Sequence, residues 1–271
     1  MSVIRQLKSW FSKQNIYPKT VEHAIYDSEG RRLDNKLESG VSNPNLLINT
    51  NFSNPVNQRE YDGSAKENEY CIDRWKLLGK LSLLSNCISL TSLQENSYLG
   101  YLVQKIEYPN EFKGRTVTLS LKYRTSSENC YMGIHTTTSS GSLRSYFHKL
   151  PVTDGAWRVE TLTIKCEDEE YAGFEFSVYC GYTLPTLDSW VSFTYGKATV
   201  SNSIDIQWAK LEDEDIATPY KRKLFGEELL LCRRYFRYGS TNTQSLYDYP
   251  MRVTPTITSI SSGKYSYDSE L

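Results

Sequence analysis

Three stretches of the chain carry residue types that bind sugars. Along residues 117–124, 130–135 and 174–180, apolar residues alternate with polar ones, so one phase would face a core and the other would lie on a sheet surface. The surface phase supplies the predicted glycan-binding residues Tyr131, His135, Tyr179, Lys122 and Glu175. Aromatic rings stack on the C–H face of a pyranose, and charged side chains bind its hydroxyls. If the three strands are neighbours, they form a glycan-binding face; an ordinary solvated sheet face with a few tyrosines is the alternative.

The opposite phase of the same stretches predicts the core. It includes two of the six cysteines, and no two cysteines form a C-x-x-C pair, so we expect free, mostly buried thiols and neither a zinc ribbon nor a redox motif. The predicted core positions are Val117, Leu119, Leu121, Tyr123, Cys130, Met132, Ile134, Phe174, Phe176, Val178 and Cys180.

Catalytic and metal-binding patterns are scarce. The chain has three histidines and no G-x-S-x-G, P-loop or G-x-G-x-x-G motif, and the acidic runs 167–170 and 212–215 fit solvated turns. We therefore expect no enzyme and no cofactor. A structural Ca²⁺ is possible, with Asn49 and Asp205 as weak candidate ligands.

The elements that must position these residues are strands. Turn-forming Gly, Pro, Asn and Ser residues separate the strand-like segments, and no helical pattern lies between them. This succession of strands predicts an antiparallel jelly-roll β-sandwich. The polar tract 53–70 is expected to be a long loop. The predicted strands are 75–78, 81–84, 87–91, 98–108, 115–125, 130–137, 143–148, 157–166, 173–182, 191–195 and 203–212.

Shifts in pattern divide the chain into three parts. Residues 1–42 contain a short amphipathic helix and a connector, expected to serve attachment or oligomerisation. Residues 43–218 form the jelly roll. Residues 219–271 contain a linker, a helix over 226–237 with acidic residues first and arginines last, and the beginning of a β element at 256–261.

Composition excludes several partners. The 31 basic and 32 acidic residues nearly cancel, so no overall field favours nucleic acid or an anionic membrane. The N-terminal residues do not resemble a secretory signal, and no apolar run approaches the length of a membrane span. We expect synthesis in the cytoplasm and no membrane insertion.

Several separated anchors resemble phage and prophage tail-fibre proteins of the receptor-binding type, in which a jelly roll precedes a similar short helix. Residues 17–39 also resemble the N-terminal connector of phage tail proteins, and residues 45–52 resemble the N-L-L-x-N-x-x-F entry strand of jelly-roll carbohydrate-binding modules. The anchors are Leu211-Glu212, Ala217-Thr218-Pro219-Tyr220, Glu227-Glu228-Leu229 and Cys232-Arg233-Arg234-Tyr235.

The resemblance implies a non-catalytic virion protein of the tail, assembled in the bacterial host cytoplasm, whose jelly roll binds host cell-surface polysaccharide. It also implies a homotrimer that contacts other tail or baseplate proteins through residues 1–42. Two alternatives stay open. One is a structural spacer or baseplate adaptor that binds no glycan, and the other is a polysaccharide depolymerase.

Overall fold

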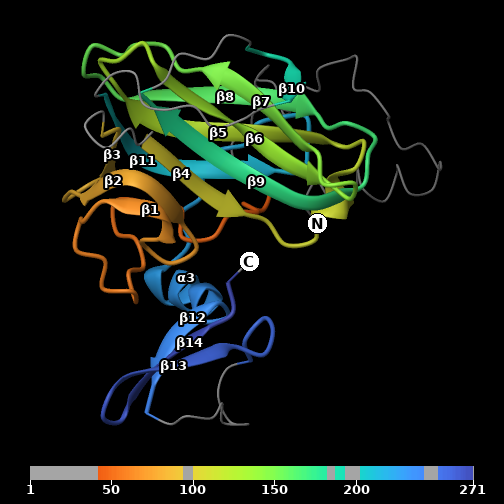
Figure 1. Cartoon of the computed structure of the whole chain (residues 1–271). Coiled ribbons are helices and arrows are strands. Elements are labelled where there is room, and N and C mark those ends of the chain that lie inside the picture. Colours follow the sequence, from red (N-terminus) through yellow and green to blue (C-terminus); the bar gives the residue numbers. More distant parts are fainter. Residues whose placement is uncertain (1–41, 94–99, 182–186, 193–201, 241–249, 271) are drawn as a thin grey trace, which may run out of the picture. The chain divides into compact units, whose positions relative to one another are not determined.

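The computed structural model describes residues 42–93, 100–181, 187–192, 202–240 and 250–270 (Figure 1). The chain divides into two compact units, Met1–Ser42 and Asn43–Leu271, and the described residues other than Ser42 belong to the second. The predicted N-terminal helix and connector lie outside the described residues. No helix in the described ranges is long and apolar enough to cross a bilayer.

The second unit is mainly β, as the alternation predicts. In the described residues, eleven strands form one antiparallel sheet that curls into a sandwich, with the order β10-β7-β6-β9-β4-β2-β3-β11-β5-β8 and with β1 paired to β2. The strands are β1 Lys66–Tyr70, β2 Lys76–Leu83, β3 Ile88–Thr91, β4 Gly100–Lys105, β5 Thr116–Arg124, β6 Cys130–Thr138, β7 Leu143–Lys149, β8 Arg158–Lys165, β9 Tyr171–Cys180, β10 Trp190–Ser192 and β11 Ser203–Glu212. The fold class predicted from the sequence, a jelly-roll β-sandwich, is confirmed.

One strand joins the two layers of the sandwich. β2 pairs with β4 through residues 76–78 and with β3 through residues 80–83, so it belongs to the first layer (β10-β7-β6-β9-β4) and to the second (β3-β11-β5-β8). Between the two segments lies Gly79, whose φ of 109° is open to glycine but not to other L residues. The prediction of two separate strands at this glycine is wrong, because the strand bends there without ending. The prediction that residues 66–70 are loop is also wrong, since they form β1.

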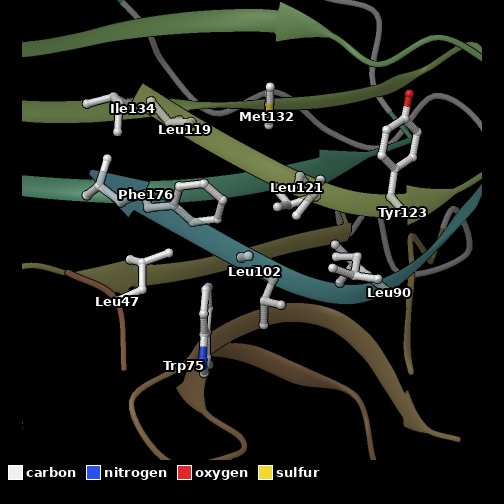
Figure 2. Packing of buried hydrophobic residues seen from close by; sticks show 14 of the residues in the cluster. Leu47, Trp75, Leu90, Leu102, Leu119, Leu121, Tyr123, Met132, Ile134 and Phe176 are labelled. Carbon is white, nitrogen blue, oxygen red and sulfur yellow. The ribbon is translucent and has the colours of Figure 1, made fainter. Parts of the chain in front are cut away.

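The core lies between the two layers. All eleven positions of the predicted core phase are buried in one hydrophobic cluster. Figure 2 shows Met132, Ile134 and Phe176 of the first layer facing Leu119 and Leu121 of the second. All six cysteines are buried and free, as predicted.

The expected entry strand at residues 45–52 is mostly irregular. Only Asn51 makes a bridge, to Trp208 of β11, although Leu46 N and Phe52 N donate to carbonyls of the same strand. The segment cannot continue as a strand because Asn49 has a φ of 59°. Its carbonyl instead accepts from the Trp75 indole at 2.9 Å.

β11, the last strand of the jelly roll, is followed by residues 213–220, here called the strap, which lie across the outer face of the second layer. Lys210 and Glu212 form a fully buried ion pair of 2.9 Å, and Lys210 Nζ also donates to the carbonyl of Thr218 at 3.1 Å. The rings of Trp208 and Tyr220 stack with centroids 4.6 Å apart. Asn43 N donates to the Thr218 hydroxyl at 2.9 Å, so the jelly roll begins and ends at one place.

The C-terminal part contains a helix, α3 (Phe225–Cys232), and a three-stranded sheet of order β12-β14-β13 (Figure 1). The strands are β12 Phe236–Gly239, β13 Thr256–Ser261 and β14 Lys264–Asp268. The expected β element at 256–261 is confirmed. The helix is shorter than the predicted 226–237, since Phe236 onward pairs with β14 and Arg237 is in a strand.

Buried polar contacts hold this C-terminal part against the jelly roll. Arg74 forms an ion pair with Glu270, both nearly inaccessible to solvent, donates to the Lys105 carbonyl at 2.7 Å, and lies over the Tyr235 ring at 3.6 Å. On α3, Glu228 accepts the backbone N–H of residue 49 at 2.7 Å. These contacts define the junction between the two parts.

Removing one charge of the buried pair should destabilise the fold strongly. We expect Glu270→Gln to lower the free energy of unfolding by about 3–5 kcal/mol, because Arg74 is left buried without a counter-charge. The matched control is Glu69→Gln in the Lys66–Glu69 pair, where the Glu69 side chain is 63 % exposed and the expected change is about 0–1 kcal/mol. Urea unfolding measures both, and equal losses would contradict the assignment.

The junction also predicts a pH dependence of stability. Burial raises the pKa of Asp73 to about 7. The hydrogen bond from Gln58 and the charge of Arg59 lower this pKa, but burial has the larger effect. The folded carboxyl therefore keeps a proton that the unfolded one, with a pKa of 3.8, releases. The stability of the wild type relative to Asp73→Asn should fall by up to about 1.4 kcal/mol per pH unit as pH rises from ~4 to ~7. A pH-independent difference in thermal unfolding would contradict this.

Candidate functional site

Four of the five predicted glycan-binding residues lie together on the outer face of the first layer. Tyr131 and Tyr179 are directly opposite each other on β6 and β9, and so are His135 and Glu175. Lys122 is not with them. It lies on β5, which pairs with β11 and β8 in the second layer, so the condition that all three strands are neighbours holds only for β6 and β9.

The same face carries a second hydrophobic cluster, here called the aromatic face, composed of Tyr101, Val103, Tyr131, Phe147 and Tyr179. The rings of Tyr101 and Tyr179 stack with centroids 4.5 Å apart. Both predicted tyrosines are only 2 % exposed. Leu187 packs against the cluster, and Asp188 N donates to the Phe147 carbonyl at 2.8 Å. The alternation placed these side chains on the correct face, but the face is covered.

A hydrogen-bonded chain crosses the edge of the aromatic face. His135 Nδ1 lies 2.6 Å from Ser145 Oγ, and its Nε2 is hydrogen-bonded to the Tyr179 hydroxyl. Burial lowers the pKa of His135 to about 3, so the ring is neutral at ordinary pH. A serine beside a histidine resembles a nucleophile and its base, but Ser145 is 1 % exposed. These hydrogen bonds are suited to holding β6, β7 and β9 together rather than to attacking a substrate.

Glu175 connects the aromatic face to an open pocket. Its carboxylate accepts from the Tyr101 hydroxyl at 3.2 Å and pairs with Lys105 at 3.5 Å. Lys105 lines a pocket of about 520 Å³ at the junction, here called the junction pocket. Its lining residues are Lys105, Ile106, Glu107, Tyr108, Pro109, Ala172, Gly173, Phe174, Arg252 and Val253.

Tyr108 is the main feature of the junction pocket. It caps the short 3₁₀ helix η2 (Pro109–Phe112) in the left-handed conformation, with φ and ψ both 56°, and it is 68 % exposed. A non-glycine residue in this conformation is uncommon, and strained backbone often marks a functional site. An exposed aromatic ring in such a position is available for stacking on a ligand.

The charged groups that line the pocket are each paired with an opposite charge. Glu107 lies 3.6 Å from Arg234 and 3.9 Å from Arg252, while Lys105 pairs with Glu175. The pocket therefore offers fixed donors and acceptors without a dominant charge, which suits hydroxyl-rich ligands. Sequence reasoning missed Tyr108 and Arg252. The only sequence feature that points to Tyr108 is a Tyr-Pro step at the end of a predicted strand. Nothing in the sequence indicates that Arg252 lies beside β4.

The calcium candidates are engaged elsewhere. The Asn49 carboxamide bonds the backbone of Val56 and Asp73, and Asp205 pairs with Arg124 at 2.9 Å. In the described ranges, no group of three or more His, Cys, Asp or Glu side chains is arranged to hold a metal ion.

No protein-family model matches the sequence, and neither does any curated protein. Solved structures with a similar fold include the CBM22-1 xylan-binding domain from Paenibacillus barcinonensis, with 9 % identity, 65 % of this chain and 98 % of that chain covered, and a TM-score of 0.38. The enzymatically active domain of bacteriophage CBA120 tailspike protein 4 matches with 11 % identity, 62 % and 21 % coverage, and a TM-score of 0.36. TmCBM61 in complex with β-1,4-galactotriose matches with 12 % identity, 63 % and 99 % coverage, and a TM-score of 0.32. Likenesses of this size carry no conclusion about function.

The buried histidine predicts a pH effect opposite in sign to that of Asp73. With a folded pKa of about 3 against an ordinary 6.5, His135 remains neutral where the unfolded side chain takes up a proton. The stability of the wild type relative to His135→Gln should therefore decline as pH falls from ~6.5 to ~3, by up to about 1.4 kcal/mol per pH unit. Thermal unfolding of both proteins across this range measures the difference. A difference that is flat, or that grows toward acid, would show that the ring is not held neutral.

Proposed function

We propose that this chain is a phage or prophage tail protein of the receptor-binding type that binds a host surface glycan without cleaving it. The observation that carries the binding proposal is the junction pocket with Tyr108 at its rim. The likeness of the sequence anchors to tail-fibre proteins supports the location. Of those anchors, Glu212 forms the buried pair with Lys210, while Thr218 and Tyr220 lie in the strap and Glu228 accepts the backbone N–H of residue 49.

The pocket has the size and chemistry for part of a saccharide. Its volume of about 520 Å³ falls within the ~300–1,000 Å³ of ordinary ligand pockets. The Tyr108 ring can stack on the C–H face of a pyranose, the Glu107 carboxylate can accept from hydroxyls, and the Arg252 guanidinium can donate to them.

A binding role suits the carboxylates better than a hydrolytic one. A glycosidase requires two carboxyl groups on opposite sides of the scissile bond, one of which gives a proton. Glu107 is flanked by Arg234 and Arg252, and Glu175 is bound by Lys105 and Tyr101. Each is therefore fixed as a hydrogen-bond acceptor, which supports the non-catalytic proposal.

The proposal includes a homotrimer attached to other tail or baseplate proteins through residues 1–42. Supporting it are apolar side chains that α3 and its approach leave in solvent, with Leu224 68 %, Phe225 48 % and Leu230 46 % exposed. Less apolar surface is free than the sequence suggests, because Tyr235 and Phe236 are buried within the chain. Light scattering on the full chain tests the trimer, and a monomer would remove it.

The central test is retention of the full-length protein on host cell-wall polysaccharide. Tyr108→Ala should weaken binding about tenfold, the loss expected for one stacked ring, whereas Tyr108→Phe keeps the ring and should bind like the wild type. Because Tyr108 is mostly exposed, neither variant should change thermal stability. Tyr131→Ala and Tyr179→Ala test the predicted sheet face in parallel and require a check of folding, since both rings are buried.

Each alternative has its own outcome in this experiment. Retention that Tyr108→Ala leaves unchanged contradicts the junction pocket as the site. No retention of the wild type on any host polysaccharide supports the spacer or adaptor. Reducing ends released from the polysaccharide support the depolymerase.

A further inference from the structure

Two adjoining depressions lie at the far end of the strands from the junction pocket. A depression of about 330 Å³ adjoins one of about 180 Å³, and the two share Ser126 and Ser203. Together they form a polar groove, here called the serine groove. Its lining includes Arg124, Asp205 and Asn202, and serines and threonines make up most of the rest.

The groove and the junction pocket lie at opposite ends of β9. Phe174, near the start of that strand, lines the junction pocket. Cys180, at its end, directs its thiol toward the Asn202 carbonyl in the groove, at 3.6 Å. Phe174 and Cys180 are six residues apart on β9, and strands rise about 3.3 Å per residue, so these two residues place the sites about 20 Å apart.

One end of the groove has the side chains that hold a vicinal diol. Arg124 Nε donates to Asp205 Oδ2 at 2.9 Å, and the guanidinium lies over the Trp157 ring at 4.9 Å. The pair keeps further donors on Arg124 and acceptors on Asp205, side by side and fixed in direction. Trp157 is half-buried, so its ring offers an apolar surface beside them.

The other end contains an unused donor. The amide nitrogen of Asn202 is buried and has no hydrogen-bond partner in the part of the chain that the structure describes. Buried amide donors are nearly always paired, so one without a partner requires an explanation. Rotation of the carboxamide toward the groove would satisfy it with a ligand hydroxyl. Apart from Gly155, the remaining lining residues bear hydroxyls, and the Arg124–Asp205 ion pair adds no net charge that would select an ionic ligand.

We propose that the serine groove is a second saccharide site, which takes a neutral pyranose through a diol bound by Arg124 and Asp205. It rests on the proposed glycan-binding function and extends it to two sites per chain. Two sites so far apart would engage separate segments of one polymer, or separate polymers, and would raise retention on a surface through multivalency rather than through new contacts.

The test uses the full-length protein with a panel of neutral trisaccharides: β-1,4-galactotriose, cellotriose, maltotriose and xylotriose. The indole N–H signal of Trp157, assigned with Trp157→Phe, reports on the groove by NMR. We expect at least one trisaccharide to shift this signal saturably, and Asp205→Asn to weaken that binding about tenfold. The matched control, Glu160→Gln, changes a carboxylate bound to Arg158 outside the groove lining and should leave the titration unchanged.

The two sites can fail separately. In Tyr108→Ala the Trp157 signal should still shift, and calorimetry should find that one of the two sites per chain keeps its affinity while the other is about tenfold weaker. If no trisaccharide shifts the Trp157 signal, the groove proposal is wrong, even where Tyr108→Ala weakens retention and the proposed function stands. If the Trp157 signal shifts while Tyr108→Ala has no effect on retention, the groove stands and the junction pocket fails. A shift that Asp205→Asn leaves unchanged also contradicts the groove.

Discussion

The sandwich depends on the bend of β2 at Gly79. The residues before the bend complete the layer that contains the aromatic face, and those after it lead into the layer that contains the serine groove. A side chain at a φ of 109° would be strained, so a non-glycine residue there would oppose the curl that brings both layers over one core. The junction pocket takes its jelly-roll residues from β4, β9 and an adjoining loop in the first layer, and the serine groove takes its residues from β3, β5, β11 and adjoining loops in the second, so the curl joins both sites in one sandwich.

The junction adds a second constraint, of a different physical kind. A hydrophobic core tolerates small shifts of its side chains, but the buried guanidinium of Arg74 requires its counter-charge and its carbonyl acceptor in fixed directions. The junction pocket takes residues from both sides of this contact, with Lys105 and Tyr108 from the jelly roll and Arg252 from the C-terminal part. Its shape is therefore tied to the contacts that hold the two parts together.

Period-two alternation was sufficient to predict the sandwich, its core positions and the face on which Tyr131, His135 and Tyr179 lie. It could not show whether that face is covered, because alternation fixes the side of a sheet and not what packs over it. It could not show that Lys122 lies in the other layer, because strand order depends on contacts between residues that are distant in the sequence. Tyr108 was missed because a single left-handed residue has no periodicity. The helix was overextended because the pairing of Phe236 with Asp268 outweighs the local helical pattern.

The hydrogen bond from Asn43 to Thr218 has a consequence for modularity. A domain whose chain enters and leaves at neighbouring points can be inserted into another chain, because its two ends lie close together. Another sandwich with similarly placed ends could replace this one only if it also supplied partners for the buried contacts of the C-terminal part, which are the Arg74 side chain for Glu270 and the backbone N–H of residue 49 for Glu228. The segment after β11 that contains Thr218 and Tyr220 would then be the attachment point that such inserts share.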